Sequence, residues 1–592
     1  MDIMLTKIEK RGYLGRRMHV AMLVVVIAVQ GCSRAGVEVP DIADVAASSA
    51  DIQPNILVIL ADDLGYSDIG PFGAEIQTPT LDALAAEGMV LTNFRVHTMC
   101  SPTRAMLLTG LDSHRVGYGT MSGEYTDATR GQPGYEARLD PKIETLGNRL
   151  QRLGYRTFIA GKWDMGGRGN PDLWPIRRGF DNSWVLIEGS ASHFGKQSAL
   201  AELPSVTYVA NDSEVELPNN FYSSDVYADK AIEFIDANGD KTQPFFGYLS
   251  FTAPHYPLQA PDDYIARYAG QYDEGYEAVR NARVKRMRET GIIGVDEQAA
   301  PRHPVWPSWE KLPDKIRMLE SRRMEIYAAM IESMDHNIGR VVEHLKSTGQ
   351  WENTVVLFFS DNGPEGGNPL DWGGEPWFDW AENSFDTSLE NMGRANSYVW
   401  AGPGWAYVSA TPFRDAKGFT TEGGIRSPMI ITWPGHIRAG ATLRADAHIL
   451  DLMPTIMAMA GDDRGHESIL GRSMLPALTG AAANIHGEGE QFGLELLGRR
   501  ALILGNWKIT WNNAPWGRGE EWSLFNLATD PTEIDDVADQ HPEKLAELVA
   551  AWEKYAQANG VIPIPVYPMG NTNSFTHYKW LPPSMRQGPA AD

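Results

Sequence analysis

The sequence predicts an α/β fold: a large, mostly parallel central sheet flanked by helices, followed by a smaller C-terminal α+β domain that carries an antiparallel sheet. From residue 54, short apolar runs alternate with helical patterns, which is typical of a parallel sheet with crossover helices. The run at 55–61 is apolar almost throughout, as in a strand that is buried on both faces. After Trp433-Pro434-Gly435 the pattern changes to short neighbouring strands, which favours a second, smaller domain.

The remaining elements of the large domain follow in chain order. Thr78 and Pro79 suit a helix cap and a first turn, and Gly88 ends that helix. We expect further strands at 89–96, 156–160, 244–251 and 354–360. A long helix that ends at Gly349 precedes the last of them. Its buried face consists of apolar residues at spacings of three and four, namely Met324, Tyr327, Ile331, Met334, Ile338, Val341 and Leu345.

The C-terminal region has its own pattern. A helix is expected at 451–460, then antiparallel strands at 501–511 and 521–527, and a closing helix at 542–558. The chain therefore divides into a signal peptide of the lipoprotein type at 1–31, a linker at 32–53, a large domain at 54–440, a C-terminal α+β domain at 441–575 and a tail at 576–592.

Composition narrows the class of protein. The chain has 592 residues, of which 43% are hydrophobic and 22% charged, so it is neither disordered, collagen-like nor stapled by disulfides. Its net charge is −24, which makes it a poor partner for nucleic acid, and we expect no nucleic-acid partner. If the protein handles an anion, it needs a local cationic pocket.

The N-terminus resembles an export signal. Basic residues precede an apolar segment at 18–29, which is too short to read as a stable membrane span. Val29-Gln30-Gly31-Cys32 resembles a bacterial lipobox, although Gln30 is atypical. Two interpretations follow: lipidation of Cys32, which would anchor the protein to a membrane, or ordinary signal-peptide cleavage nearby. We expect a periplasmic or cell-envelope protein with a lipid anchor at Cys32.

Reactive side chains follow five apolar runs. They are Asp62-Asp63, Cys100, Lys162-Trp163-Asp164, His255 and Asp361-Asn362. Ligands of open α/β sheets bind beyond the carboxyl ends of the strands. A single Asp after a strand is more often a helix cap, and a single Pro-His is more often a turn. Because five apolar runs are each followed by such side chains, the sequence predicts a site at the carboxyl edge of the sheet.

Asp62, Asp63, Asp361 and Asn362 offer only oxygen ligands. Such a set suits a hard cation, Ca²⁺ or Mg²⁺, rather than zinc. The alternative is that Asp62 and Asp63 merely cap the next helix.

Cys100 lies in Cys100-Ser101-Pro102-Thr103-Arg104, where Pro102 suits the first turn of a helix. The start of a helix favours anions. The neighbouring Pro and Arg argue against a buried structural cysteine. Since an exposed free thiol is prone to oxidation, we expect Cys100 to be modified.

The C-x-P-x-R motif followed by AMLLTG at 105–110 resembles the signature of the sulfatase family, part of the alkaline phosphatase superfamily. The resemblance spans 54–561, and ANSYVW at 395–400 and TEGGIR at 421–426 are most similar to bacterial arylsulfatases. It implies that a formylglycine-generating enzyme oxidises Cys100 to formylglycine. It also implies hydrolysis of small-molecule sulfate esters to an alcohol or phenol plus sulfate, with 54–440 as the catalytic domain.

The resemblance also implies roles for site residues. Asp62, Asp63, Asp361 and Asn362 match calcium ligands, with the modified residue 100 completing the shell and Mg²⁺ as the lesser alternative. Arg104 would hold the modified residue. Lys162 matches the first sulfate-binding lysine, and His255 and Lys417 match residues that bind sulfate and assist the leaving group.

Asp164 departs from the family pattern, which has His after Gly-Lys-Trp. It leaves three interpretations: a working substitution as a base, which we favour, a slower enzyme, or a changed substrate. Two other functions stay open. One is a phosphodiesterase or phosphonate monoester hydrolase on the same scaffold, and the other is a catalytically silent lipoprotein that binds sulfated ligands.

Overall fold

The computed structural model describes residues 53–566 except 238, 240–241, 373 and 463–468. The predicted signal peptide with Cys32, the linker up to residue 52 and the tail at 576–592 lie outside the described residues. Within the described part of the chain, no helix combines the length and the apolar character that a membrane crossing requires.

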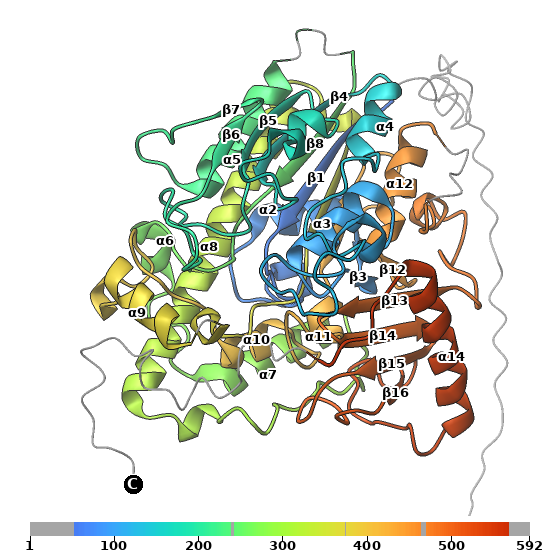
Figure 1. The fold of residues 1–592 in the computed structure, drawn as a ribbon. Helices are drawn as coiled ribbons and strands as arrows, with labels where there is room; N and C mark the ends of the chain where they lie inside the picture. The colour runs from blue at the N-terminus through green and yellow to red at the C-terminus, as the bar shows by residue number, and fades with distance from the viewer. Residues whose placement is uncertain (1–52, 238, 240–241, 373, 463–468, 567–592) are drawn as a thin grey trace, which may run out of the picture. The chain divides into compact units, whose positions relative to one another are not determined.

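A ten-stranded sheet runs through the middle of the fold in the order β11-β2-β10-β9-β1-β8-β4-β5-β6-β7 (Figure 1). Its central strands, from β9 to β5, are all parallel, whereas β10, β6 and β7 are antiparallel to their neighbours. This confirms the predicted fold class. The strands are β1 (Asn55–Ala61), β2 (Met89–Leu91), β4 (Arg156–Lys162), β5 (Asn182–Leu186), β6 (Tyr208–Ala210), β7 (Ser213–Glu214), β8 (Phe245–Ser250), β9 (Thr354–Ser360), β10 (Met429–Thr432) and β11 (Ala441–Leu443).

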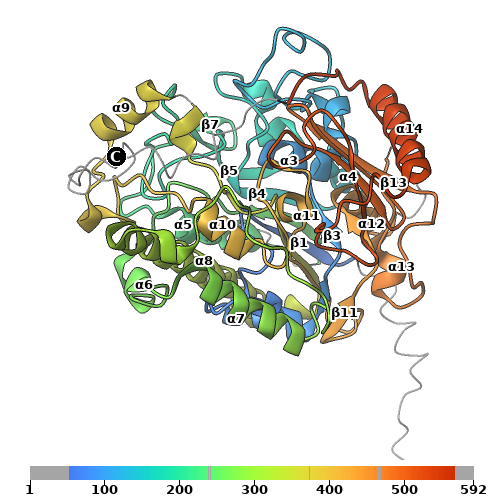
Figure 2. The ribbon, with the colours of Figure 1, turned by 90° about the horizontal axis from the view of Figure 1, so that it is seen from below.

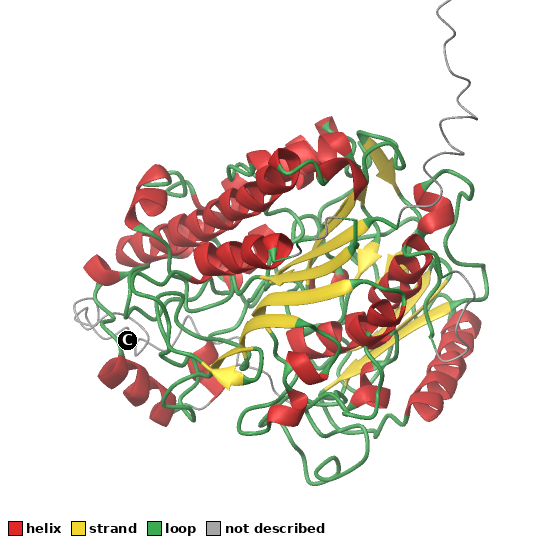
Figure 3. Ribbon diagram, turned by 90° about the horizontal axis from the view of Figure 1, so that it is seen from above, coloured by secondary structure: helices red, strands yellow, loops and turns green. Residues whose placement is uncertain are grey.

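Helices cover both faces of this sheet (Figures 2 and 3). One face carries α2 (Pro79–Glu87), α5 (Ser223–Asp236) and the long α8 (Asp314–Ser347), and the other carries α3 (Cys100–Thr109), α4 (Leu146–Arg152) and α12 (Leu452–Met459). Alternate residues of β1 enter the two cores: Leu57 and Ile59 join the α8 side, and Val58 joins the α3 side. Both faces of β1 are therefore buried, which explains its continuous apolar run.

The remaining helices lie around these layers. They are α6 (Asp262–Arg267), α7 (Gly275–Glu289), α9 (Glu375–Ser384), α10 (Pro403–Ser409), α11 (Glu422–Ile425), α13 (Leu475–Leu478) and α14 (Pro542–Asn559). The predicted helix starts at Thr78-Pro79 and Pro542 and the predicted stop at Gly88 are confirmed.

The C-terminal region contains a four-stranded antiparallel sheet with α14 packed beside it (Figure 1). Its strands are β13 (Gln491–Leu496), β14 (Arg499–Leu504), β15 (Trp507–Trp511) and β16 (Ser523–Asn526). The predicted strand at 501–511 is in fact a hairpin, because Gly505 adopts a positive φ of 56° between β14 and β15. The strand β13 was not predicted.

Two other stretches differ from expectation. The predicted strand at 89–96 is split into β2 and β3 (Phe94–Arg95), and β3 leaves the large sheet to pair with β12 (Ala447–His448). Residues 441–443, which we assigned to the smaller domain, form β11 at the edge of the large sheet, beside β2.

Candidate active site

The carboxyl ends of the parallel strands carry the predicted site residues. Strand β1 lies between β8 and β9, so Asp62-Asp63, His255 and Asp361-Asn362 follow three adjacent strands. Lys162 ends β4, the next strand along. The structure thus brings these residues to one edge of the sheet, as the pattern of strand ends predicted.

Each carboxylate of this edge meets a cationic side chain. Lys162 Nζ lies 3.0 and 2.8 Å from the two oxygens of Asp62, and Lys417 Nζ lies 2.7 and 2.9 Å from those of Asp63. Arg104 donates from Nε and Nη2 to Asp361 Oδ2 at 2.9 and 2.7 Å. All six of these side chains are almost completely buried. Coulomb attraction between them is therefore little screened by water.

Cys100 is the first residue of α3 and faces this cluster. Its Sγ lies 3.9 Å from Asp63 Oδ1, and Asp63, Asp62, His255 and Cys100 place ligand atoms within 4.8 Å of one another. Only 4% of Cys100 is exposed, and Arg104 is fully buried. The expectation that Pro102 and Arg104 argue against burial was therefore wrong: Arg104 turns inward because Asp361 neutralises its charge.

Burial and charge shift the pKa values of the site in opposite directions. Burial raises the pKa of Asp62 and of Asp361. Burial acts on Asp63 too, but the charges of Lys417 and His255 outweigh it and lower its pKa to about 2. Burial lowers the pKa of His255 to about 3 and raises that of the Cys100 thiol. At neutral pH, His255 is therefore a neutral imidazole and Cys100 a protonated thiol.

The oxygen donors fit a divalent cation. Asn362 Nδ2 donates to Asp63 Oδ1 at 2.7 Å, but the buried Asn362 Oδ1 has no hydrogen-bond partner within the described residues. Five carboxylates (Asp62, Asp63, Asp164, Asp361 and Glu365) surround only three cationic side chains (Arg104, Lys162 and Lys417). An additional cation would satisfy the free oxygen and offset the excess negative charge.

The TEGGIR motif forms a second buried ion cluster behind Lys417. Glu422 is fully buried and pairs with Arg95 at 3.0 Å, with Lys508 at 2.8 Å, and with Arg426. Lys508, on β15, also contacts Glu533 at 2.8 Å. The cluster therefore ties the segment that follows Lys417 to the C-terminal sheet.

Comparison with known families agrees with this geometry. The model of the sulfatase family matches residues 54–462, more than half of the chain. The chain belongs to the sulfatase family. Its reaction class is therefore sulfate ester hydrolysis, and the family implies a divalent metal at the buried acidic cluster.

Relatives and solved structures support the same assignment. An uncharacterized sulfatase of Schizosaccharomyces pombe is 39% identical over 535 residues, covering 87% of this chain and 95% of its own length. An arylsulfatase of Klebsiella aerogenes is 39% identical over 429 residues, covering 72% of this chain and 90% of its own. The crystal structure of Ps i-CgsB in complex with k-i-k-neocarrahexaose has a TM-score of 0.61 at 26% identity, covering 91% of this chain and 98% of that one.

Asp164 of this sulfatase lies at the edge of the cluster. Its Oδ2 accepts a hydrogen bond from Ser101 Oγ at 2.8 Å and lies 3.7 Å from Lys162 Nζ. Its backbone has a positive φ of 53°, which is uncommon for a residue other than glycine. Its side chain is 15% exposed, so it is more accessible than Asp62, Asp63 or Asp361.

Sequence reasoning missed two residues at the site. Glu365 Oε2 lies 3.7 Å from Lys417 Nζ, and burial raises the pKa of Glu365. Ser250, the last residue of β8, accepts a hydrogen bond from Arg104 Nη1. The sequence signal that could have identified them is their position, because both residues lie at or just beyond the carboxyl ends of strands.

The histidines and tryptophans near the motifs have different surroundings. His193 is buried and its Nε2 lies 3.1 Å from the carbonyl oxygen of His255, so it supports that loop. His114 is buried between Asp112 and Glu495. Trp405 packs in the core, whereas Trp400 joins an aromatic cluster with Tyr256, next to His255.

Proposed function

We propose that this sulfatase is an arylsulfatase-type sulfuric ester hydrolase whose nucleophile is formylglycine made from Cys100 by a formylglycine-generating enzyme. The observation that carries the proposal is the place of Cys100, at the start of α3 and 3.9 Å from Asp63. Because burial keeps its thiol protonated, unmodified Cys100 would be a poor nucleophile. The 39% identity with the arylsulfatase of Klebsiella aerogenes supports an aryl sulfate as substrate.

We assign the metal as Ca²⁺, held by Asp62, Asp63, Asp361 and Asn362, because hard oxygen donors favour it. Formylglycine and the cation would supply a hydroxyl nucleophile and a Lewis acid. Lys162 and Lys417 would bind the sulfate oxygens. Burial opposes their charge, but the neighbouring carboxylates outweigh it and raise the pKa of both ammonium groups, so both carry a positive charge. Arg104 would hold the first turn of α3 against Asp361.

Of the three candidate side chains for proton transfer, His255, Lys417 and Asp164, we assign the transfer to two. His255 Nδ1 lies 2.7 Å from the carbonyl oxygen of Tyr256, which makes Nδ1 the protonated nitrogen of a neutral ring. A neutral His255 is poorly suited to protonate a leaving group. We therefore assign proton donation to Lys417, and proton acceptance during sulfate release to Asp164.

A peptide mass tests the nucleophile. Trypsin releases residues 96–104 as one peptide, and protein from the native host should show sulfur replaced by carbonyl oxygen at position 100. An intact thiol would remove the proposed nucleophile. Turnover of 4-nitrophenyl sulfate should exceed that of bis(4-nitrophenyl) phosphate and of a phosphonate monoester. Faster turnover of the phosphorus esters would favour the alternative hydrolase, and no turnover of any ester would favour a binding protein.

The location in the cell rests on the sequence pattern at 29–32. We infer a cell-envelope protein anchored through a lipid on Cys32. The test is detergent phase partition of the protein from its host: the wild type should enter the detergent phase, and Cys32→Ser should leave it. Equal partition of both proteins would contradict the anchor.

A further inference from the structure

A second group of metal-ligating side chains lies outside the catalytic cluster. His448 ends β12, Asp451 ends the short 3-10 helix η9 (Ile449–Asp451), and His486 lies in the loop before β13. We name these three residues the His448 cluster. Their ligand atoms lie within 4.8 Å of one another. Asp451 Oδ2 is 2.8 Å from His486 Nε2 and 3.4 Å from His448 Nδ1.

His448 has an unused ligand atom. The residue is only 8% exposed, and its ring is stacked between His486 and Phe492, with centroids 4.6 and 4.4 Å away. Although its side chain caps η9, no hydrogen bond of normal geometry reaches Nδ1 from the described residues. A buried nitrogen whose only hydrogen-bond contact is this distorted cap is unfavourable, so a ligand for this atom would stabilise the fold.

The surroundings of His486 match those of a metal-binding histidine. Its Nδ1 lies 2.9 Å from Glu490 Oε2, and Arg472 holds Glu490 Oε1 from Nε and Nη2 at 3.0 and 2.7 Å. In a metal-bound histidine, a carboxylate on one ring nitrogen fixes the proton there and leaves the lone pair on the other for the ion. Here that other nitrogen, Nε2, donates a hydrogen bond to Asp451 Oδ2 at 2.8 Å, so a bound ion would displace the Nε2 proton.

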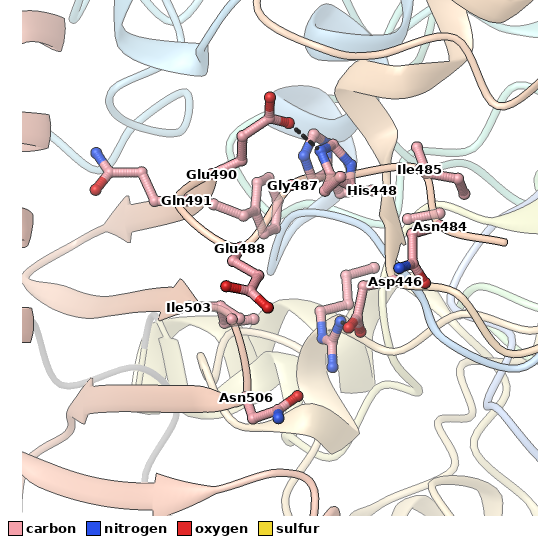
Figure 4. A pocket seen from close by; sticks show the side chains of 15 residues that line it. Asp446, His448, Asn484, Ile485, Gly487, Glu488, Glu490, Gln491, Ile503 and Asn506 are labelled. Atoms are coloured by element: carbon pink, nitrogen blue, oxygen red, sulfur yellow. Dashed lines mark hydrogen bonds and ion pairs between the residues drawn. The ribbon is translucent and has the colours of Figure 1, made fainter. Parts of the chain in front are cut away.

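Two members of the His448 cluster, His448 and His486, line a cavity of about 200 Å³, drawn in Figure 4. Its wall includes the acidic residues Asp446, Glu488 and Glu490, and the basic residue Arg95. The balance of charge is negative, which favours a cation. The cavity is also large enough for a water molecule to complete a coordination shell.

We propose that His448, Asp451 and His486 bind a divalent transition-metal ion of the Zn²⁺ class, separate from the catalytic site. Bonds of about 2.0–2.2 Å in a tetrahedral shell separate neighbouring ligand atoms by about 3.3–3.5 Å. The 3.4 Å between His448 Nδ1 and Asp451 Oδ2 fits this value, and the 2.8 Å between His486 Nε2 and Asp451 Oδ2 must lengthen by about 0.5 Å. Two imidazoles and one carboxylate favour Zn²⁺ over Ca²⁺. The ion would join the loop before β13 to β12 and η9.

Metal binding to the full-length protein tests the site. The chelator-stripped wild type, His486→Gln and His344→Gln are titrated with Co²⁺ by visible absorption, and Zn²⁺ per chain is counted by mass spectrometry. His344 is the matched control, because its Nε2 also lies 2.8 Å from a carboxylate, that of Asp236, on the outer side of α8. We expect His486→Gln to bind one Zn²⁺ fewer, or to bind it at least tenfold more weakly. His344→Gln should match the wild type.

Equal Zn²⁺ stoichiometry and affinity in the wild type and His486→Gln would overturn the proposal. The cluster would then be a hydrogen-bonded network in which His486 bridges Asp451 and Glu490. If His486→Gln does not fold, His448→Phe is the second variant, because a phenyl ring keeps the stack on Phe492. It should lose the same ion, and an unchanged Zn²⁺ count would again overturn the proposal. Activity with aryl sulfates is not the readout, so the result does not depend on the proposed function.

Discussion

Replacing Asp164 with Asn separates two roles of this side chain, proton acceptance and the orientation of Ser101. Asn keeps the shape and an oxygen that can accept the hydrogen bond from Ser101 Oγ, now 2.8 Å away, but it removes the negative charge 3.7 Å from Lys162 Nζ. At that separation two unit charges attract by about 4 kcal/mol if the effective dielectric constant is about 20. In the wild type this attraction would compete with the proposed binding of an anionic sulfate to Lys162.

We therefore expect Asp164→Asn to leave KM unchanged or to lower it. If Asp164 accepts a proton during sulfate release, kcat should fall by about 100-fold or more. The assay is steady-state turnover of an aryl sulfate over a range of concentrations. Asp172→Asn, an exposed acid in the same loop, is the control and should match the wild type.

A kcat within twofold of the wild type, together with a lower KM, would refute the role as a base. Asp164 would then only orient Ser101. The complementary variant Asp164→His should retain activity and shift the pH profile, because imidazole titrates nearer to neutral pH than a carboxylate. A folded but inactive Asp164→His protein would count against the interpretation as a working substitution.

Three further predictions follow from charges described above. Removal of divalent ions should abolish turnover and added Ca²⁺ should restore it, because the excess of carboxylates in the metal-free site would repel sulfate. Full activity after chelation, with loss of the metal verified by mass spectrometry, would contradict this prediction. Burial alone would lower the pKa of His114, but hydrogen bonds to Asp112 and Glu495 raise it to about 10, above the unfolded value of 6.5. The stabilisation that protonated His114 provides is thus complete below pH 6.5 and is lost towards pH 10, at up to about 1.4 kcal/mol per pH unit. In urea unfolding, His114→Gln should flatten the dependence of the free energy of unfolding on pH between these values. An unchanged dependence would contradict the prediction. Lys508→Met should lower the free energy of unfolding by about 3–5 kcal/mol, because it removes a buried cation that Glu422 and Glu533 share and leaves Glu422 only Arg95 and Arg426. Lys544→Met on the surface should change the free energy of unfolding by less than about 0.5 kcal/mol, and a loss below about 1 kcal/mol for Lys508→Met would be inconsistent with the buried cluster.

The central strands and long helices could be predicted because their signals are local. The run at Asn55–Ala61 and the spacing of apolar residues along α8 each depend on one element and its burial. The order of the strands and the split between β2 and β3 depend on distant partners, such as Ala447 opposite Phe94. β13 does carry a strand signal, because Phe492, Leu494 and Leu496 alternate with polar residues or glycine, and the sequence analysis overlooked it.

The grouping of the site residues was predictable because parallel strands bring their carboxyl ends together. The pairing of charges was not. Arg104 is buried because Asp361, 257 residues later, neutralises it, and no local pattern records that contact. Glu365 was missed for the same reason, since its partner Lys417 lies on a separate loop. The His448 cluster also joins residues that are 35 positions apart, too far for a metal motif to be read from spacing.

Because Cys100 is buried in the folded protein, any enzyme that modifies it has to act before this part of the chain folds. Once α3 packs against Asp63 and Asp361, only 4% of the cysteine is accessible, and the active site of a second protein cannot reach Sγ without unfolding this turn. The oxidation of Cys100 that we propose would therefore compete with folding of the newly made polypeptide. The active fraction in a preparation would depend on the ratio of these two rates, so slower synthesis or more of the modifying enzyme would raise specific activity without any change in the sequence.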